Sequence, residues 1–272
     1  MNNCMTCMTL RPAVVVAALV VTAAMVTLQA LPAAAQMQLT GDRISAASGG
    51  DIVVHPMHHA TLVLSWNGKV IYVDPAAAPG GDGAASAAAA FKGLPPPDLI
   101  LVTDIHGDHF NAPTLVDLAG PNTRIVAPQA VIDQMPDGLK ATTTAVANAQ
   151  VVTIDTIMIE GVPMYNITED RLKFHAKGRG NGYVVTLGGT RLYIAGDTEA
   201  HAEMKALKDI DVAFIPMNLP YTMTPEQAAE GVLAFKPSIV YPYHYGESDV
   251  AAFAKLVGAN PDIEVRRQDW YP

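Results

Sequence analysis

Short apolar runs separated by turn-forming residues mark the chain after residue 50 and predict β-strands. Residues 52–54, 61–66 and 69–73 are rich in β-branched and aromatic side chains, which favour strands. The Asn-Gly pair at 67–68, between the last two runs, is a strong signal for a two-residue hairpin turn. Residues 98–102 form another apolar run of the length expected for a buried strand.

Further along the chain, strand and helix patterns alternate, which predicts an α/β fold of layered sheets and helices. Helices are expected at 113–118 and 129–135, on either side of a strand at 124–127, and strand patterns return over 142–163. The sequence Thr-Pro-Glu-Gln at 224–227 predicts a helix start with a capping box. Nothing marks an interdomain linker where these strand patterns return. The strand-rich second half suggests a duplicated sandwich of two sheets with helices outside.

Residues 1–35 have the pattern of a secretory signal peptide. A single basic residue, Arg11, precedes an apolar run over 13–28, and small residues at 33–35 resemble a cleavage site. The alternative is a retained membrane anchor, but the run is short for a transmembrane span and no charges follow it directly. We expect cleavage after Ala35, which would leave residues 36–272 as one periplasmic or secreted domain without a stable membrane anchor.

Composition narrows the chemistry of this predicted domain. The two cysteines, Cys4 and Cys7, lie in the signal peptide, so disulfides and thiolate metal sites are excluded once it is removed. The chain has 26 acidic and 17 basic residues and a formal net charge of −9. Because no basic run offsets repulsion from phosphates, nucleic acid is not expected as the main partner. We expect a small-molecule substrate, and the sequence leaves the oligomeric state open.

Four side chains that can bind metal ions lie directly after the predicted strand at 98–102. They are Asp104, His106, Asp108 and His109. Ionisable groups this close repel one another and resist burial, so a bound cation is the simplest cause of the cluster. Asp104, His106 and Asp108 lie two residues apart and can converge, whereas Asp108 and His109 diverge and can serve two ions. The alternative is a polar surface loop whose histidines have no function.

The sequence T-D-I-H-G-D-H at 103–109 resembles the T-H-x-H-x-D-H motif of the metallo-β-lactamase superfamily. It departs at one position, because Asp104 stands where the superfamily has its first histidine. The resemblance extends over nearly all of the chain after the signal peptide and implies a four-layer αββα sandwich. Residues 219–229 and 241–246 resemble the subgroup that includes ascorbate-phosphate lactonases and N-acyl-phosphatidylethanolamine phospholipases.

The same resemblance implies three metal ligands later in the chain. His175 precedes a glycine-rich loop and a strand, Asp197 lies in a Gly-Asp-Thr sequence, and His244 lies in Tyr-His-Tyr-Gly. Asp197 is expected to bridge two ions, because each of its carboxylate oxygens can bind one. The alternative for Asp197 is that it caps the helix that follows.

Other residues near these motifs have less definite roles. The His-Ala pair at 59–60 and the Asp-Pro pair at 74–75 match the superfamily pattern, and His59 either faces the site or is a structural histidine. Arg179 is a candidate contact for an anion. Glu199 and His201 are expected behind the ligands or at the surface. Tyr243 and Tyr245 are either packing aromatics or proton donors.

Together the ligands imply two divalent metal ions. One ion is expected to bind Asp104, His106, His175 and one oxygen of Asp197. The other is expected to bind Asp108, His109, His244 and the second oxygen of Asp197. Zinc is the expected metal. Because Asp104 adds a negative charge where the superfamily has a neutral ring, Mn²⁺ or Fe²⁺ is an alternative.

Such a site predicts hydrolysis, because water between two divalent ions is acidified and becomes a nucleophile. Asp108 is expected to orient this water, and His59, a tyrosine or a second water to protonate the leaving group. We therefore expect an exported metal-dependent hydrolase of a lactone, phosphoester or related ester. Two alternatives stay open, a specific β-lactamase and an exported metal- or ligand-binding protein without hydrolase activity, because the fold alone does not choose among them.

Overall fold

In the computed structural model of the chain, the described residues are Met1, 39–76 and 85–271. Apart from Met1, the predicted signal peptide and its cleavage site lie outside them. The chain divides into two compact units, Met1–Gln36 and Met37–Pro272, and the fold described below is that of the second unit. Within the described part of the chain, no helix has both the length and the apolar character needed to cross a bilayer.

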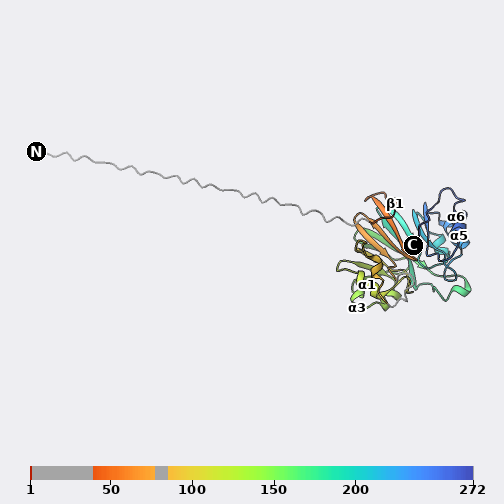
Figure 1. The fold of residues 1–272 in the computed structure, drawn as a ribbon, viewed down its shortest axis with the longest axis horizontal. Coiled ribbons are helices and arrows are strands. Elements are labelled where there is room, and N and C mark those ends of the chain that lie inside the picture. The colour runs from red at the N-terminus through yellow and green to blue at the C-terminus, as the bar shows by residue number, and fades with distance from the viewer. Residues whose placement is uncertain (2–38, 77–84, 272) are drawn as a thin grey trace. The chain divides into compact units, whose positions relative to one another are not determined.

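Two seven-stranded sheets form the centre of this unit (Figure 1). The first sheet contains, in spatial order, β1 (Asp42–Ser45), β2 (Asp51–His58), β3 (Thr61–Trp66), β4 (Lys69–Val73), β5 (Leu99–Leu101), β6 (Arg124–Ala127) and β7 (Thr143–Ala145). The second contains β8 (Val151–Ile154), β9 (Ile157–Met164), β10 (Gly180–Leu187), β11 (Thr190–Ile194), β12 (Val212–Pro216), β13 (Ile239–Tyr243) and β14 (Glu264–Val265).

The two sheets share one mixed topology. In the first, β1 to β4 pair antiparallel and β4 to β7 pair parallel. In the second, β8 to β11 pair antiparallel and β11 to β14 pair parallel. Antiparallel neighbours need only tight turns such as the predicted one at 67–68, whereas parallel neighbours need crossover connections, which are the natural place for helices.

Helices cover the outer faces of both sheets, and Figure 1 shows α1 and α3 on the opposite side from α5 and α6. Those near the first sheet are α1 (Ala112–Leu118), α2 (Gln129–Gln134) and α3 (Asp137–Lys140). Those near the second are α4 (Ala202–Lys205), α5 (Pro225–Phe235) and α6 (Val250–Val257). Two 3-10 helices, η1 (Ala88–Phe91) and η2 (Glu169–Arg171), lie in the connections. The predicted α/β fold with αββα layers is confirmed.

Strand β12 illustrates how the layers are held together. Val212 and Phe214 pack in the core between the sheets, whereas Ala213 and Ile215 pack in the outer core with the helices. All four side chains are fully buried, as expected for a parallel strand covered on both faces. Because β11 and β13 both run parallel to β12, the loops after them leave the same edge of the second sheet.

Thr224 begins α5 with the predicted capping box. Its hydroxyl accepts a hydrogen bond from the backbone N–H of Gln227 at 3.2 Å, and the Gln227 side chain accepts one from the backbone N–H of Thr224 at 3.0 Å. We predict that Thr224→Ala lowers the free energy of unfolding by about 1 kcal/mol, measured by urea unfolding. Thr224→Ser keeps the hydroxyl and is expected to match the wild type. An alanine variant as stable as the wild type would contradict this role of the cap.

Candidate metal centre

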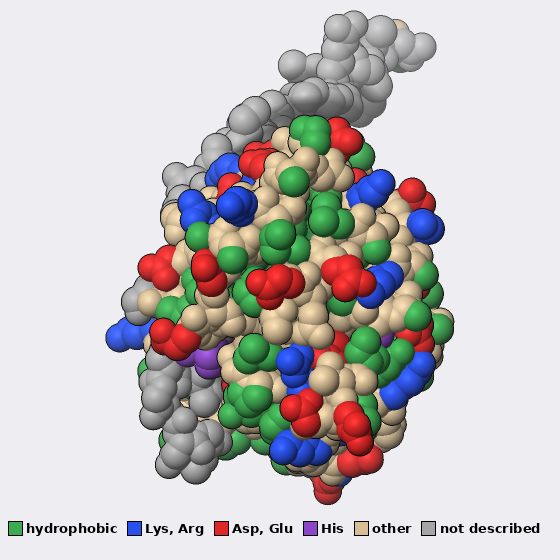
Figure 2. Space-filling model, turned by 90° about the vertical axis from the view of Figure 1, so that its right-hand side faces the viewer, with side chains coloured by type: hydrophobic (Ala, Val, Ile, Leu, Met, Phe, Trp, Pro, Cys, Tyr) green, Lys and Arg blue, Asp and Glu red, His purple; other side chains and the backbone are tan. Residues whose placement is uncertain are grey.

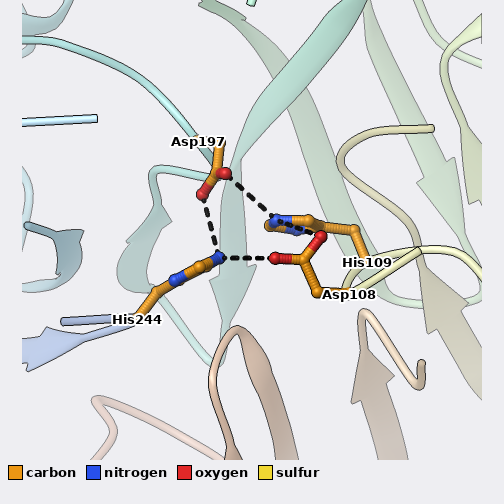
Figure 3. A group of neighbouring side chains, drawn as sticks. All are labelled: Asp108, His109, Asp197 and His244. Atoms are coloured by element: carbon orange, nitrogen blue, oxygen red, sulfur yellow. Dashed lines mark ion pairs between the residues drawn. The ribbon is translucent and has the colours of Figure 1, made fainter. Parts of the chain in front are cut away.

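All seven predicted ligand residues lie together in two neighbouring groups. Cluster A consists of Asp104, His106 and His175. Cluster B consists of Asp108, His109, Asp197 and His244, which Figure 3 shows pointing toward one another. Within each cluster the potential ligand atoms lie within 4.8 Å of one another. Positions far apart in the sequence therefore converge as the resemblance implied.

Loops at strand ends bring these side chains together. The loop after β5 carries the first four ligands, His175 precedes β10, and Asp197 and His244 follow β11 and β13. Gly196 has a φ of 64°, and a Cβ atom there would lie 2.5 Å from the sulfur of Met164. Only glycine fits this turn without strain, so Gly196 allows the chain to turn sharply just before Asp197. The helix-cap alternative is wrong, because His201 is the N-cap of α4.

Asp197 lies at the centre of the two clusters. Its Oδ1 is 3.3 Å from Nε2 of His244, and its Oδ2 is 3.4 Å from Nε2 of His109 and 3.2 Å from Nε2 of His175. Burial alone would raise the pKa of Asp197, but the imidazoles of His244 and His109 hold it well below its ordinary value. The side chain is therefore a carboxylate that faces ligands of both clusters, the arrangement expected of a bridging ligand.

Four buried polar atoms at this centre form no hydrogen bond within the described residues: Nε2 of His109, His175 and His244, and Oδ1 of Asp197. Leaving buried polar atoms unpaired is costly. The Nδ1 atoms of the three rings have neighbours of their own. Nδ1 of His109 lies 2.8 Å from Asp74, that of His175 3.1 Å from the Tyr221 carbonyl, and that of His244 3.4 Å from the Asn218 amide. An oxygen acceptor at Nδ1 of His109 and of His175 leaves Nε2 of each ring free to bind a metal, and these atoms converge with Nε2 of His244, which fits a divalent metal ion.

Asp74 contacts a predicted ligand, and the sequence did not reveal this contact. It is fully buried at the end of β4 and accepts hydrogen bonds from the backbone N–H and hydroxyl of Thr103, at 2.7 and 2.6 Å, and from Nδ1 of His109. Burial raises the pKa of Asp74, and the interactions with His109 and Thr103 oppose that rise. Its role depends on the parallel pairing of β4 with β5, which places it beside the ligand loop.

Cluster A differs from cluster B because the side chain of Arg179 contacts it. Arg179 donates from Nε and Nη2 to the two carboxylate oxygens of Asp104, at 3.2 and 2.9 Å. Its Nη2 also donates to the carbonyl of Phe174 at 2.6 Å and lies 3.4 Å from Nε2 of His106. The anion that Arg179 contacts is therefore a carboxylate of the chain itself.

His59, predicted as a catalytic residue, lies beside cluster B. Its ring stacks on that of His244 with centroids 4.8 Å apart, and its Nδ1 lies 2.8 Å from the hydroxyl of Tyr271. Both histidines have positive φ angles, 51° and 46°, a strained conformation often found at functional sites. Burial, and then the nearby His244, lowers the pKa of His59 to about 4, so its imidazole is neutral at pH 7. Its catalytic role stays a prediction.

Glu199 and His201 are buried, so the surface alternative is wrong for both. Glu199 accepts hydrogen bonds from the side chains of Arg171 and Thr168, at 2.6 and 2.7 Å, and so fixes the segment before His175. The Tyr243 hydroxyl accepts a hydrogen bond from the backbone N–H of Gly196 at 2.8 Å. Its ring lies in the core between the sheets, which favours the packing alternative.

Comparisons with known proteins show which family this chain resembles. The model of the beta-lactamase superfamily domain matches residues 54–244. A UPF0173 metal-dependent hydrolase of Thermococcus onnurineus is 32% identical over 176 residues, which cover 61% of this chain and 77% of the relative. One of Pyrococcus horikoshii is 30% identical over 217 residues, which cover 76% of this chain and 92% of the relative.

A solved structure from Parabacteroides distasonis, named as a metal-dependent hydrolase, has 36% sequence identity and a TM-score of 0.74. The similarity covers 85% of this chain and 99% of that one. The fold and the site thus define a metal-dependent hydrolase with a metallo-β-lactamase fold. The chain belongs to the metallo-β-lactamase superfamily and, within it, to the UPF0173 metal-dependent hydrolase family.

The contacts of Asp74 generate a prediction about metal affinity. Asp74→Asn keeps the shape of the side chain but removes the carboxylate that holds the His109 ring. We predict that zinc binding weakens by about 10- to 100-fold, measured by competition with a chromophoric chelator. Asp117→Asn, an exposed position in α1, is the matched control and should leave the affinity unchanged. An Asp74 variant that binds zinc like the wild type would exclude this orienting role.

Proposed function

We propose that the protein is an exported hydrolase that uses two divalent ions, zinc in the first instance, to cleave a lactone, phosphoester or related ester in a small molecule. The observation that carries this proposal is the convergence of three unpaired imidazole nitrogens and one unpaired carboxylate oxygen in the two clusters. Imidazole-rich sites favour zinc, whereas the carboxylates at 104 and 108 also suit Mn²⁺ or Fe²⁺. The resemblance to lactonases and phospholipases supports ester-type substrates.

Bound ions would supply Lewis acidity, which acidifies water and polarises the substrate oxygen. The side chains of the chain supply orientation. Asp108 is 40% exposed, whereas His109 and His244 are almost fully buried, so Asp108 is the member of cluster B that can contact incoming water. Although burial opposes it, the neighbouring imidazoles, that of His109 foremost, lower the pKa of Asp108. Asp108 is therefore a carboxylate at neutral pH and can accept a hydrogen bond from the attacking water.

Substrate access is proposed on the side where His106 and Asp108 lie, because these are the two predicted ligands with substantial exposure, 40% each. His59 borders the same centre but is held by Tyr271 and by stacking on His244. A neutral imidazole in this position is better suited to hold His244 in place than to donate a proton. We therefore favour water as the proton donor to the leaving group and keep His59 as the alternative.

A small-molecule substrate is also consistent with the surface charge. On the face seen in Figure 2, Lys and Arg side chains are interspersed with Asp and Glu, and the net charge of the chain is −9. A mixed and net acidic surface does not attract a phosphate backbone. Nucleic acid is therefore not proposed as a partner.

We predict that the purified, zinc-loaded protein hydrolyses at least one member of a panel containing acyl lactones, phosphomonoesters, phosphodiesters, carboxylic esters and nitrocefin. Asp197→Asn should reduce turnover by about 100-fold or more, because it removes a charge shared by both clusters. Asp117→Asn is the control. Turnover of nitrocefin alone would support the β-lactamase alternative. Bound metal without any turnover would support the binding-protein alternative.

Export is tested separately. When the full chain is expressed in a bacterium with an outer membrane, we predict a periplasmic or secreted product whose first residue is Gln36, measured by intact mass and N-terminal sequencing. Ala35→Arg should retain the precursor, because a signal-peptide cleavage site requires small residues. A product of full mass in the cytoplasm would contradict export.

A further inference from the structure

We propose that the two clusters bind divalent ions with unequal affinity, and that Arg179 is the residue that weakens binding at cluster A. This inference rests on the proposed metal chemistry and adds an order of loading to it: cluster B fills first. Three observations support it, and each concerns a contrast between the clusters.

The first observation is the charge around each set of ligands. The only carboxylate of cluster A, Asp104, has no exposed side-chain surface and is already paired with the guanidinium of Arg179. Asp197 faces both clusters, so the carboxylate that cluster B has for itself is Asp108. Among the described residues, the ion pairs of Asp108 and Asp197 involve histidines and no Lys or Arg. At cluster B no lysine or arginine neutralises the carboxylates, so they attract a metal ion more strongly than the paired Asp104 does.

The second observation is the orientation of the Asp104 carboxylate. The oxygen nearest to His175 is Oδ2, 3.7 Å from Nε2 of that ring. The same Oδ2 accepts from Nη2 of Arg179 at 2.9 Å and lies 2.8 Å from Nδ1 of His106. A metal ion at cluster A must compete with both contacts. It would also lie within a few ångströms of a guanidinium, which is charged at every accessible pH.

The third observation is the distribution of unpaired atoms. Of the four buried atoms without a hydrogen bond at this centre, three belong to cluster B and one, Nε2 of His175, belongs to cluster A. Asp104 and His106 contact each other, and both contact Arg179, so their polar atoms already have partners. An unpaired buried polar atom is costly, and a bound metal ion removes this cost. The gain in free energy on metal binding is therefore larger at cluster B.

The alternative is that the Arg179 pair only anchors the loop before β10, since Arg179 also donates to the carbonyl of Phe174. The two interpretations differ in the sign of one effect. If Arg179 repels a metal ion at cluster A, its removal strengthens binding there, because Asp104 loses its only arginine partner and keeps only the contact with His106. If it only holds the loop, its removal weakens binding or leaves it unchanged.

The test is a zinc titration of the exported, metal-free protein by calorimetry and chelator competition, with bound metal counted after dialysis. We expect two steps in the wild type, the second at least about tenfold weaker, because the ion at cluster A lies beside the Arg179 guanidinium. His175→Ala should remove the weaker step, and His244→Ala the stronger one. These assignments do not depend on turnover.

Arg179→Gln should tighten the weaker step by about tenfold or more and change the stronger step by much less. Arg179→Lys keeps the charge and should stay near the wild type, and Arg43→Gln is the matched control, since Arg43 pairs with Asp51 outside both clusters. Thermal unfolding identifies a variant that fails to fold, and Arg179→Met then provides a second neutral side chain of similar length.

Equal affinities in the wild type, or a weaker step that Arg179→Gln leaves unchanged or weakens, would overturn the inference. Wild-type protein that binds no zinc would overturn it together with the proposed function. Unequal steps that shift as expected, in a protein without turnover on the substrate panel, would support the inference and contradict the proposed hydrolysis.

Discussion

The site depends on the burial of ionisable groups that the protein itself does not fully pair. Asp197 and three imidazoles meet where loops of the two sheets converge, and their inward-facing atoms form no hydrogen bonds within the described residues. Burial of this kind is unfavourable unless something neutralises it. The surrounding contacts are then easily understood. Asp74, the Tyr221 carbonyl and Asn218 each lie against the outer nitrogen of one ring, so the inner nitrogens keep their direction.

Much of this arrangement could be predicted from the sequence, because short stretches of neighbouring residues specify it. The runs at 61–66 and 69–73 with their Asn-Gly turn became β3 and β4, and the Thr224 capping box became the start of α5. The candidate ligands were predictable because four of them lie within six residues of the chain and the others resemble motifs of one superfamily. In each case neighbouring residues carry enough information to specify the structure.

What could not be predicted depends on contacts between distant segments. Asp74 was visible only as half of an Asp-Pro pair, and its role arises because β4 pairs with β5 and brings it beside His109. Arg179 lies 75 positions from Asp104, and a glycine-rich loop gives no indication of the carboxylate that its arginine meets. Asp104, which departs from the superfamily motif, is paired with Arg179.

The shared topology of the two sheets has a further consequence. Asp104 to His109 come from the first sheet, whereas His175, Asp197 and His244 come from the second, so a bound ion acts as a cross-link between the two halves of the sandwich. An ion that binds the folded chain and not the unfolded one stabilises the fold in proportion to the logarithm of its free concentration. The melting temperature of the protein should therefore rise with the concentration of free metal. Loss of the metal would lower the stability of the fold as well as the activity of the site.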